Sequence, residues 1–506
     1  MKKSISPISG IKYEIPTEKD KKIKSFIEQN ACKKVVAVQG LGFVGTVMSL
    51  VVANNDNNQY CVIGVDQPSE SSYWKIGDIN NCQVPVVSSD PLVADYFNES
   101  IKRSNFYATH DHNAYSYADV IIVDINLDVT KVKDIDNNIK SYDVPMDSFK
   151  NAMRYIGKVC KPDALILVET TVPPGTCKKI VKPIILEELK KRNLPLDQVL
   201  LGHSYERVMP GPNYINSIKN FYRVYSGIDR ESADAVEAFL KTVISTDEYP
   251  LTRLDNTEST EIAKVLENSY RAMNISFAIE WSRFAELSGV NLYDVIDAIR
   301  LRPTHANLMY PGIGVGGYCL TKDPLLASWA SQEFFGLEGG LDSSVKAVEK
   351  NDKMPTYCFN FVRDILKGKD EDIKIGLLGV AYGPGIGDTR FSPVENFYKH
   401  LSQLYKDIYC NDPYLNYWDE LKLDIETSLN KFFENNFDVL IITTGHKDYI
   451  EGDLIYNVLK TLKKMPTIID TVGLLNNNKL PACYKHDNFH VLGVGTKKEK
   501  IKWRKF

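Results

Sequence analysis

The chain has 506 residues, 43% of them hydrophobic and 25% charged, a length that predicts about three domains rather than one core. Its net charge of −4 excludes a general attraction to nucleic acid, so an anionic ligand must be held by a local pocket. Nine cysteines at irregular spacing, with no CxxC pair, exclude a disulfide framework or zinc site and favour the reducing cytoplasm. We therefore expect no metal site.

The first 32 residues are charged and lack the apolar core of a signal peptide, so we interpret them as an added N-terminal arm. The next segment, Val35 to Ala53, is apolar enough to imitate a membrane span, but its glycines favour a strand, a turn and a helix. We expect no integral membrane segment. Residues 497–506 form a basic tail.

Residues 33–245 alternate short β-branched runs with longer helical stretches, which predicts a parallel sheet built from βαβ units. The predicted strands are KVVAVQG, YCVIGVD, ADVIIVDI, DALILVETT and VLLGHS. The polar stretch between Val129 and Met146 is expected to be a mobile loop, followed by a helix from Met146 to Cys160.

A glycine-rich turn follows the first of these strands. In GLGFVG, Gly40 permits the tight turn, Gly42 lets the backbone approach a pyrophosphate and Gly45 allows close helix packing. Asp66 ends the next strand, where its carboxylate can bind a ribose 2′-hydroxyl and repel a 2′-phosphate. The pattern predicts an NAD site rather than an NADP site, and the alternative is a tight turn without a ligand. The other turn residues expected to bind the cofactor are Leu41, Phe43 and Val44.

Residues 246–352 are predicted to form a helical middle domain around one long helix, from Ser259 to Ser288, capped by a Ser or Thr near Ser259. Residues 353–496 again contain strand runs: IKIGLLGVAY, DIYCNDPY, DVLIITTG and TIIDTVG. The predicted fold is α/β, with two Rossmann-like parallel-sheet domains joined by the long helix and the helical middle domain.

The stretch PGIGVGGYCLTKDP poses a choice for Cys319, which is either a buried core residue, as most cysteines are, or a nucleophile. Four other stretches bear on that choice. ETTVPPGT places Thr171 after a strand, and YERVMPGP places Glu206 and Arg207 after another. Lys264 and Asn268 stand four residues apart, and hence on one face of the long helix.

The fourth stretch, GVAYGPGIGDTRFSP, places Asp388 and Arg390 in a loop of the second sheet. Each stretch alone has a structural explanation, such as a surface lysine or a capping threonine. Together, and in this order, they resemble the UDP-glucose/GDP-mannose dehydrogenase family of nucleotide-sugar oxidoreductases from about residue 33 to 495.

The resemblance implies an NAD-binding first domain, a helical middle that forms a homodimer and a UDP-binding last domain. It also implies two hydride transfers that convert the C6 alcohol of a UDP-sugar to a carboxylate, with Cys319 as the covalent nucleophile. Asp323 matches an acid/base group, Lys264 and Asn268 an oxyanion-stabilising pair, and Thr171 and Glu206 positions beside water and cofactor. The residues that the resemblance places at the substrate are Glu206, Arg207, Lys264, Asn268, Tyr310, Gly316 and Arg390. Arg390 is expected to reach the substrate either within its own subunit or across a dimer interface.

The chemistry of the residues agrees with these roles. A thiolate that adds to an aldehyde forms a thiohemiacetal, which can lose a second hydride to give a thioester that water hydrolyses. A lysine ammonium stabilises the developing oxyanion, and an aspartate four residues past the cysteine can move a proton. The glycines before Cys319 are expected to let the backbone approach a diphosphate.

Two positions depart from the family pattern: Gly383 stands where a lysine is common, and Val472 where an arginine is common. ERVMPG favours a UDP-N-acetylhexosamine as substrate without separating the manno, gluco and galacto forms, and the implied pathway supplies surface polysaccharide precursors. Three alternatives remain open at this point: a UDP-glucose 6-dehydrogenase, a two-electron hydroxy-acid dehydrogenase that uses Lys264 as base, and a binding protein without catalysis.

Overall fold

The computed structural model describes residues 2–134, 138–208, 211–368, 372–475, 480 and 488–495. By internal contacts the chain divides into two compact units. Unit 1 contains residues 1–130, 143–266 and 329–338, and unit 2 contains residues 131–142, 267–328 and 339–506. The division falls inside the long helix α9, Thr257–Ser288. The partition into three domains stays a prediction.

Unit 1 is built on an eight-stranded sheet with the order β12-β11-β10-β9-β6-β3-β4-β5. Its strands are β3 (Lys34–Gln39), β4 (Tyr60–Val65), β5 (Phe106–Thr109), β6 (Val120–Val123), β9 (Leu165–Val168), β10 (Leu200–His203), β11 (Val224–Gly227) and β12 (Thr252–Arg253). All neighbours pair in parallel except β10 and β11, which are antiparallel. The five strands predicted from apolar runs are confirmed, while β5, β11 and β12 lacked such runs.

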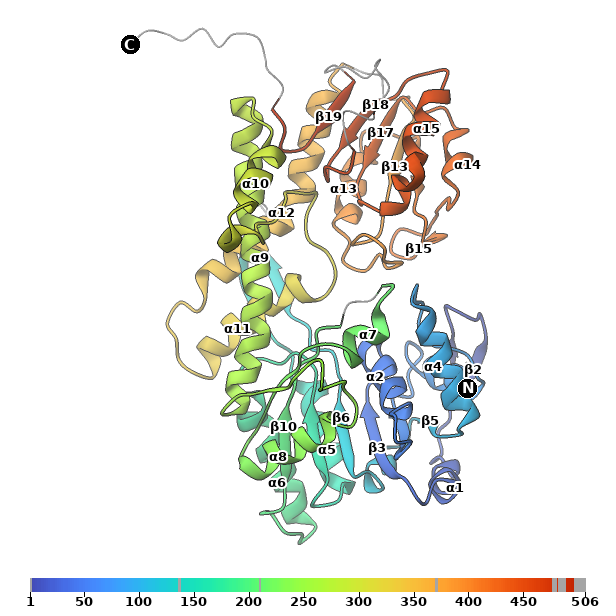
Figure 1. Ribbon diagram of the computed structural model, residues 1–506, viewed down its shortest axis with the longest axis vertical. Coiled ribbons are helices and arrows are strands. Elements are labelled where there is room, and N and C mark those ends of the chain that lie inside the picture. The colour runs from blue at the N-terminus through green and yellow to red at the C-terminus, as the bar shows by residue number, and fades with distance from the viewer. Residues whose placement is uncertain are drawn as a thin grey trace. The chain divides into compact units, whose positions relative to one another are not determined.

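The helices of unit 1 cover this sheet, as Figure 1 shows for α2, α5, α6 and α8. They are α2 (Phe43–Ala53), α3 (Tyr73–Asn80), α4 (Pro91–Lys102), α5 (Asp147–Val159), α6 (Lys182–Lys191), α7 (Tyr214–Lys219) and α8 (Arg230–Leu240), with the short 3₁₀-helix η1 (His112–Ser116) and the short π-helix η2 (Cys177–Val181). All six residues of β4 are buried, and the apolar side chains of α2 pack in the same core. The apolar run from Val35 to Ala53 is therefore core. In the described parts of the chain, no helix is both long and apolar enough to cross a bilayer.

The N-terminal arm is ordered against unit 1. It contains the two-stranded sheet of β1 (Lys3–Ile5) and β2 (Lys12–Glu14), followed by α1 (Lys22–Gln29). Phe26 of α1 is buried and stacks on Tyr107 of β5 with ring centroids 5.5 Å apart. The arm is thus packed on the edge of the sheet that ends with β5.

Unit 2 holds the second sheet, with the order β14-β13-β17-β18-β19 and every pair parallel. Its strands are β13 (Ile375–Leu378), β14 (Ile408–Asn411), β17 (Val439–Ile442), β18 (Thr467–Asp470) and β19 (Phe489–Val491), and β15 (Tyr417–Trp418) pairs with β16 (Leu423–Asp424) in a separate ribbon. The four predicted strands are confirmed.

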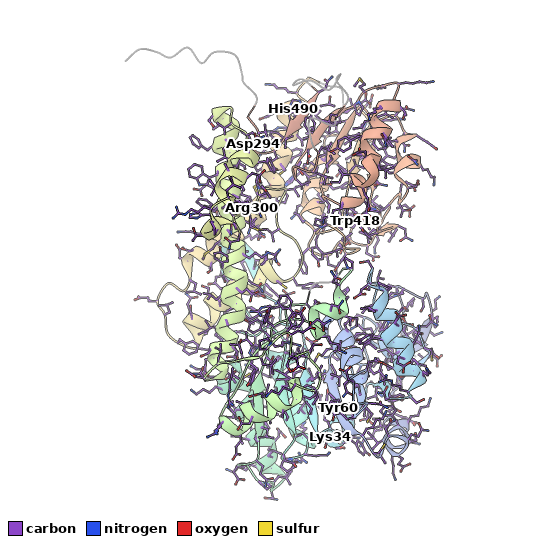
Figure 2. The ribbon with its side chains drawn as sticks, in the orientation of Figure 1. Lys34, Tyr60, Asp294, Arg300, Trp418 and His490 are labelled. Carbon is purple, nitrogen blue, oxygen red and sulfur yellow. The ribbon has the colours of Figure 1, made fainter. Side chains whose placement is uncertain are left out.

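Alternate residues of these strands enter two cores, because side chains of a strand alternate between its faces. Ile375 and Leu377 of β13 pack with α12 (Asp342–Ile365) and α13 (Pro393–Leu401), together with the fully buried Trp418 labelled in Figure 2. Leu378 packs on the other face with α14 (Leu429–Phe433) and α15 (Leu454–Thr461). The remaining helices of unit 2 are α10 (Leu292–Arg300), the turns η3 (Pro303–His305), η4 (Lys447–Tyr449) and η5 (Glu451–Asp453), and α11 (Cys319–Glu333), which ends in unit 1.

Two local expectations were wrong. The stretch after Val129 is not a plain loop, because β7 (Thr130–Lys133) and β8 (Ile139–Asp143) form a small sheet, and Lys131 and Lys133 pair with Asp352 at 3.1 and 2.8 Å. Helix α9 begins two residues before Ser259, and its cap is Asn256, whose Oδ1 accepts from the Ser259 amide at 2.9 Å. The long helix and the helix predicted around residues 146–160 are confirmed.

Candidate active site

The turn between β3 and α2 has the geometry that the glycine spacing predicts. Gly40 adopts a φ of +99°, and a Cβ there would lie 2.3 Å from the Asp124 carbonyl oxygen. A Cβ at Gly45 would lie 1.9 Å from the Gly40 carbonyl oxygen. At Gly42, by contrast, a Cβ would meet no described atom within 4 Å. The first and third glycines are required by the fold, whereas the space beside the second is open to a ligand.

Asp66 lies at the carboxyl end of β4, beside this turn. Its Oδ2 accepts from the Leu41 amide at 3.1 Å and pairs with Lys75 Nζ at 2.9 Å. Its Oδ1 accepts from the Gln67 amide at 2.7 Å. The sequence analysis missed Lys75, which stands nine residues further on in α3, because only the fold brings it to the carboxylate. Phe43 and Val44 open α2, so all the predicted cofactor residues of GLGFVG lie around this one turn.

An acidic cluster at the same edge of the sheet, with Glu169 fully buried and Asp124 half-buried, was also missed. Asp124 follows β6, Glu169 follows β9, and Arg223 pairs with Glu169 at 3.5 Å. Burial, and then repulsion from Glu169 and Glu206, holds the pKa of Asp124 well above its usual range. Burial raises the pKa of Glu169 to about 7, against the opposing effect of Arg223. A carboxylate directly after an apolar strand run was the available sequence signal at both positions.

Thr171, Glu206 and Arg207 follow strands β9 and β10, as predicted. Thr171 and Glu206 are half-buried, and Glu206 accepts from the Val208 amide. Arg207 donates to the Tyr222 carbonyl at 3.0 Å and to the Tyr205 hydroxyl at 3.1 Å. Residues 209 and 210 of ERVMPG lie outside the described residues.

Lys264 lies in the part of helix α9 that belongs to unit 1. Its Nζ donates to the Glu206 carbonyl at 2.8 Å, and the side chain is buried. Burial, and then the Lys264 charge, lowers the pKa of the nearby His203 to about 3, so this imidazole is neutral. One turn earlier, Glu261 accepts from the Gly175 and Cys177 amides at 2.5 and 2.8 Å, which fixes the PPGT turn after Thr171 to the helix.

In unit 2, Cys319 is exposed at the first position of α11, so the core-residue interpretation is wrong for this thiol. Of the eight described cysteines, only Cys32 and Cys82 are also exposed. The N-terminus of a helix favours a thiolate over a thiol. This position therefore suits a nucleophile.

Asp323 lies one turn beyond Cys319 and is completely buried. Its Oδ1 pairs with Lys322 Nζ at 2.9 Å, and its Oδ2 accepts from Asn268 Nδ2 at 2.6 Å. Asn268 was predicted to act beside Lys264, and it follows Lys264 by one turn of α9. The structure shows that its amide binds the predicted acid/base carboxylate, a pairing of residues 55 apart in the sequence.

The glycines before Cys319 pack against the chain itself. A Cβ at Gly316 would lie 2.7 Å from both Tyr382 Cβ and the Phe391 carbonyl oxygen, and one at Gly317 would lie 2.9 Å from the Tyr382 ring. At these two positions the fold alone requires glycine, a reason different from the expected approach to a diphosphate. Burial, followed by the charges of Asp388 and Cys319, raises the pKa of Tyr382 to about 12.

Arg390 lies in the same unit as Cys319. Its Nη2 and Nε pair with Asp388 at 2.6 and 2.9 Å, and its Nη1 donates at 3.2 Å to the hydroxyl of Tyr318, the residue before Cys319. Tyr310 instead contacts α10: its hydroxyl donates to Asp297, and its ring stacks on Tyr293 with centroids 5.6 Å apart. Arg390 therefore binds the residue next to the thiol, whereas the contacts described for Tyr310 are with α10.

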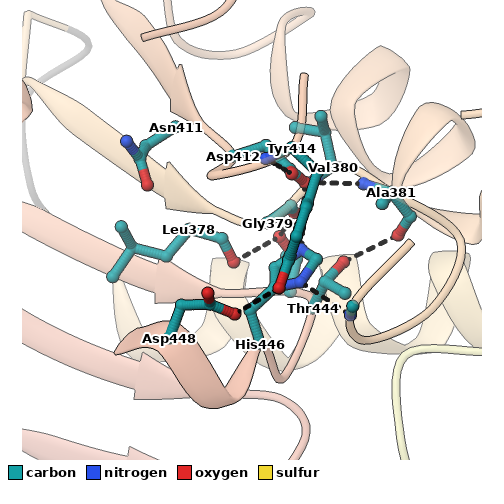
Figure 3. Close-up of polar contacts among 12 residues, drawn as sticks. Leu378, Gly379, Val380, Ala381, Asn411, Asp412, Tyr414, Thr444, His446 and Asp448 are labelled. Atoms are coloured by element: carbon teal, nitrogen blue, oxygen red, sulfur yellow. Dashed lines mark hydrogen bonds and ion pairs between the residues drawn. The ribbon is translucent and has the colours of Figure 1, made fainter. Parts of the chain in front are cut away.

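The loop that carries Arg390 is anchored at the carboxyl edge of the second sheet (Figure 3). Asp412 Oδ2 accepts from the Val380 and Ala381 amides at 2.9 and 3.0 Å and from His446 Nε2 at 3.1 Å. His446 Nδ1 in turn accepts from the Gly385 amide at 3.1 Å. Because Asp412 and His446 are both fully buried, these bonds fix the start of the loop.

Comparison with known proteins assigns three segments of the chain to three domains of one family. Residues 34–244 match the NAD binding domain of the UDP-glucose/GDP-mannose dehydrogenase family, residues 258–351 its central domain and residues 376–477 its UDP binding domain. The UDP-N-acetyl-D-mannosamine dehydrogenase of Pyrococcus horikoshii is 27% identical over 82% of this chain and 90% of its own length. That of Methanocaldococcus jannaschii is 27% identical over 93% and 98%.

Among solved structures, the UDP-D-ManNAc dehydrogenase from Pyrococcus horikoshii matches with a TM-score of 0.74 and 25% identity, over 91% of this chain and 99% of its own. The UDP-glucose dehydrogenase from Pyrobaculum islandicum matches with a TM-score of 0.72 and 19% identity, over 92% and 98%. The second likeness shows the fold alone. The chain belongs to the UDP-glucose/GDP-mannose dehydrogenase family and is an NAD-dependent nucleotide-sugar dehydrogenase.

Proposed function

We propose that this dehydrogenase oxidises the C6 alcohol of a UDP-N-acetylhexosamine to the carboxylate, through a covalent intermediate on Cys319. The observation that carries the proposal is the exposed thiol at the start of α11, one turn from the buried Asp323 that binds Asn268, and beside Tyr318, which binds Arg390. NAD, when bound, supplies the hydride acceptor for both oxidations. The turn residues Gly40 to Gly45 and Asp66 would hold it.

The proposed reaction consumes one sugar nucleotide, two NAD⁺ and one water, and it releases the acid, two NADH and protons. After the first hydride leaves C6, the Cys319 thiolate adds to the aldehyde carbon and forms a thiohemiacetal. Loss of the second hydride leaves a thioester, which water cleaves to restore the thiol. Lys264 is assigned to the oxyanion of these steps, and Asp323 to the transfer of a proton.

UDP-N-acetyl-D-mannosamine is the first candidate substrate, because the Pyrococcus and Methanocaldococcus relatives carry that name. UDP-glucose is the alternative, since a UDP-glucose dehydrogenase shares the fold. The test is kcat/KM with NAD for UDP-glucose and for the manno, gluco and galacto forms of the UDP-N-acetylhexosamine. We expect an N-acetylated substrate to exceed UDP-glucose by about tenfold or more, the scale of one pocket contact. A higher kcat/KM for UDP-glucose than for all three would contradict the substrate assignment.

Arg390 is proposed to bind the anionic sugar nucleotide, because a guanidinium pairs with phosphate or carboxylate oxygens in a fixed fork. We expect Arg390→Ala to raise KM for the sugar nucleotide by about 10–100-fold. KM for NAD should stay within about twofold, and Arg390→Lys should fall between, since it keeps the charge without the fork. Equal changes in both KM values would leave Arg390 with a structural role only.

Asp66 is proposed to bind the adenosine ribose and select NAD. We expect Asp66→Ser to lower the NAD/NADP ratio of kcat/KM by about 10²-fold, because it removes the 2′-hydroxyl acceptor and the repulsion of a 2′-phosphate, while Lys75 remains. The matched control is Asp119→Ser. Asp119 also binds a lysine, Lys161 at 2.6 Å, and a backbone amide, that of Val35 at 2.9 Å. An unchanged ratio in Asp66→Ser would remove Asp66 from the cofactor site.

A homodimer through α9 is also proposed, and an exposed apolar face of that helix supports it. Phe277 and Trp281 lie on this face with ring centroids 6.0 Å apart, and Phe284 follows at 5.9 Å from Trp281. Such spacings of three, four and seven residues are typical of helices that pack on a partner. The face consists of Ile262, Leu266, Tyr270, Phe277, Trp281, Phe284 and Leu287, each at least 45% exposed.

We expect the double variant Trp281→Glu/Phe284→Glu to elute as a monomer, because two buried charges at an apolar interface are not compensated. Light scattering coupled to size exclusion measures the mass. The control is Val87→Glu, an apolar residue that is 60% exposed in unit 1. A dimer that persists in the double variant, or a wild-type monomer, would contradict this interface.

Cytoplasmic location and a role in supplying surface polysaccharide precursors stay predictions. The eight described cysteines are free thiols, which supports a reducing compartment.

A further inference from the structure

The N-terminal arm, the first 32 residues, lies outside the three family domains, the first of which starts at residue 34, and the contacts described below are made by its residues 2–20. It nevertheless makes specific polar contacts with unit 1. These contacts converge on two segments, residues 70–78 and residues 107–111, which flank Asp66 in the fold. Strands β1 and β2 of the arm, which Figure 1 shows beside the N-terminus, pack on α3, and α3 in turn packs on β5, the edge strand of the first sheet.

The first attachment is the completely buried carboxylate of Asp78 in α3. Its Oδ2 accepts from Ser6 Oγ at 2.6 Å, and its Oδ1 accepts from Tyr13 OH at 2.6 Å and Ser9 Oγ at 3.0 Å. The Tyr13 ring also packs on Gly77, where an added Cβ would lie 2.5 Å from it. Burial, and then the Asp78 contact, raises the pKa of Tyr13 to about 12. The arm therefore supplies three hydroxyl donors to a buried carboxylate of α3.

The second attachment lies one turn earlier in α3. Ser4 is completely buried, its Oγ donates to the Glu70 carbonyl at 2.7 Å, and the same oxygen accepts from the Trp74 amide at 3.0 Å. Lys75 stands between Trp74 and Asp78, so arm contacts hold the helix on both sides of the lysine. Lys75 is the residue whose Nζ lies 2.9 Å from Asp66 Oδ2.

The third attachment is to the end of β5. Asp20 Oδ2 accepts from Tyr107 OH at 2.7 Å and Thr109 Oγ1 at 2.8 Å. The Asp20 amide donates to Asp111 Oδ2 at 3.0 Å. The carbonyl of Thr109 in turn accepts from the Asp66 amide at 3.1 Å. The arm thus contacts Thr109, which binds the Asp66 backbone, and the residues on both sides of Lys75, which binds the Asp66 side chain.

We propose that the arm is a positioning element for the cofactor: it fixes α3 and the end of β5, so that Lys75 and Thr109 hold Asp66 in the orientation that binds the adenosine ribose. This inference rests on the proposed placement of the ribose at Asp66. The arm touches neither the ribose nor the sugar nucleotide in this account. It increases affinity for NAD by ordering Asp66 before the cofactor arrives.

The test uses the full chain with Ser6→Ala/Tyr13→Phe, which removes two of the three hydroxyl donors to Asp78. We expect the dissociation constant of NADH, measured by fluorescence titration, and KM for NAD to rise about tenfold, with kcat and KM for the sugar nucleotide within about twofold. Lys75→Ala should raise the same two quantities. Combining it with the arm variant should add little, because both act through Asp66.

The matched control is Tyr225→Phe. Tyr225 OH donates to the Glu237 carboxylate in the same unit, on β11, near the opposite end of the sheet. Tyr225→Phe removes the same kind of tyrosine–carboxylate hydrogen bond and should leave the affinity for NADH unchanged. If the arm variant folds and binds NADH as tightly as wild type, or weakens both ligands equally, the inference is overturned.

A measurement on the unaltered protein covers the case in which the arm variant does not fold. Amide hydrogen exchange should slow by about threefold or more in residues 2–20 and 70–78 when NAD binds, but not in residues 230–240. No change in the arm would overturn the inference. Asp66→Ser distinguishes the proposed ribose site from the role of the arm. If this variant binds NAD as tightly as wild type, the placement of the ribose at Asp66 is wrong. If it binds NAD more weakly while the arm variants do not, only the inference about the arm is wrong.

Discussion

Replacement of Cys319 by serine is expected to lower the rate of acid formation by about 10³-fold or more, because a hydroxyl is a far poorer nucleophile than a thiolate. The variant should fold, since the side chain is exposed and the loop before it is fixed by the packing of Gly316 and Gly317 on Tyr382 and Phe391. It should still bind both ligands. The reaction should stall after the first hydride transfer or at a slowly hydrolysed ester.

Rapid-quench analysis and mass spectrometry of Cys319→Ser measure the aldehyde, the acid and any adduct at residue 319. The matched control is Cys32→Ser, which alters another exposed thiol and should leave the rate unchanged. Acid formation by Cys319→Ser at close to the wild-type rate would show that the thiol is not the nucleophile.

Asp323→Asn is expected to lower kcat by about 10²–10⁴-fold, the usual contribution of a positioned acid or base. It should also lower the free energy of unfolding by about 3–5 kcal/mol, because it leaves the buried Lys322 ammonium without its counter-charge at 2.9 Å. Steady-state kinetics and urea denaturation measure the two effects separately.

The double variant Lys322→Met/Asp323→Asn separates catalysis from stability. Removal of both charges should restore most of the unfolding free energy, because no unpaired buried ion remains. Activity should stay low if Asp323 moves a proton. Recovery of activity together with stability would assign Asp323 a structural role only.

The buried strands and the glycine turn could be predicted from the sequence, because short runs of residues specify them. Buried parallel strands require β-branched apolar runs, and so β3, β4, β6 and β13 were all visible in the sequence. The turn after β3 was visible because its glycine spacing is a local pattern: Gly45 packs on the Gly40 carbonyl five residues earlier, although Gly40 itself packs on Asp124 after the neighbouring strand β6.

The remainder depends on contacts between distant segments, which no periodicity encodes. The pairing of Asn268 with Asp323 joins two helices, and that of Asp66 with Lys75 depends on where α3 lies. The arm was interpreted as an addition because Ser6 and Tyr13 carry no pattern of their own. Their role became clear only from their hydrogen bonds to Asp78, a buried carboxyl group more than sixty residues away in the sequence.

Edge strands were the other class of failure. Strand β12 forms one edge of the first sheet, with β11 beside it, and β7 and β8 form a two-stranded sheet of their own. Strands β7 and β12 are short and mostly exposed, so their composition resembles that of loops, whereas β11 is mostly buried but only four residues long.

The stoichiometry of NADH to sugar nucleotide tests the central claim most directly. With limiting UDP-N-acetyl-D-mannosamine, excess NAD and wild-type enzyme, absorbance gives the NADH formed and chromatography gives the acid. A four-electron oxidation through Cys319 predicts two NADH and one uronic acid per sugar consumed, with no free aldehyde. One NADH per sugar, with an aldehyde or ketone as the final product, would contradict it.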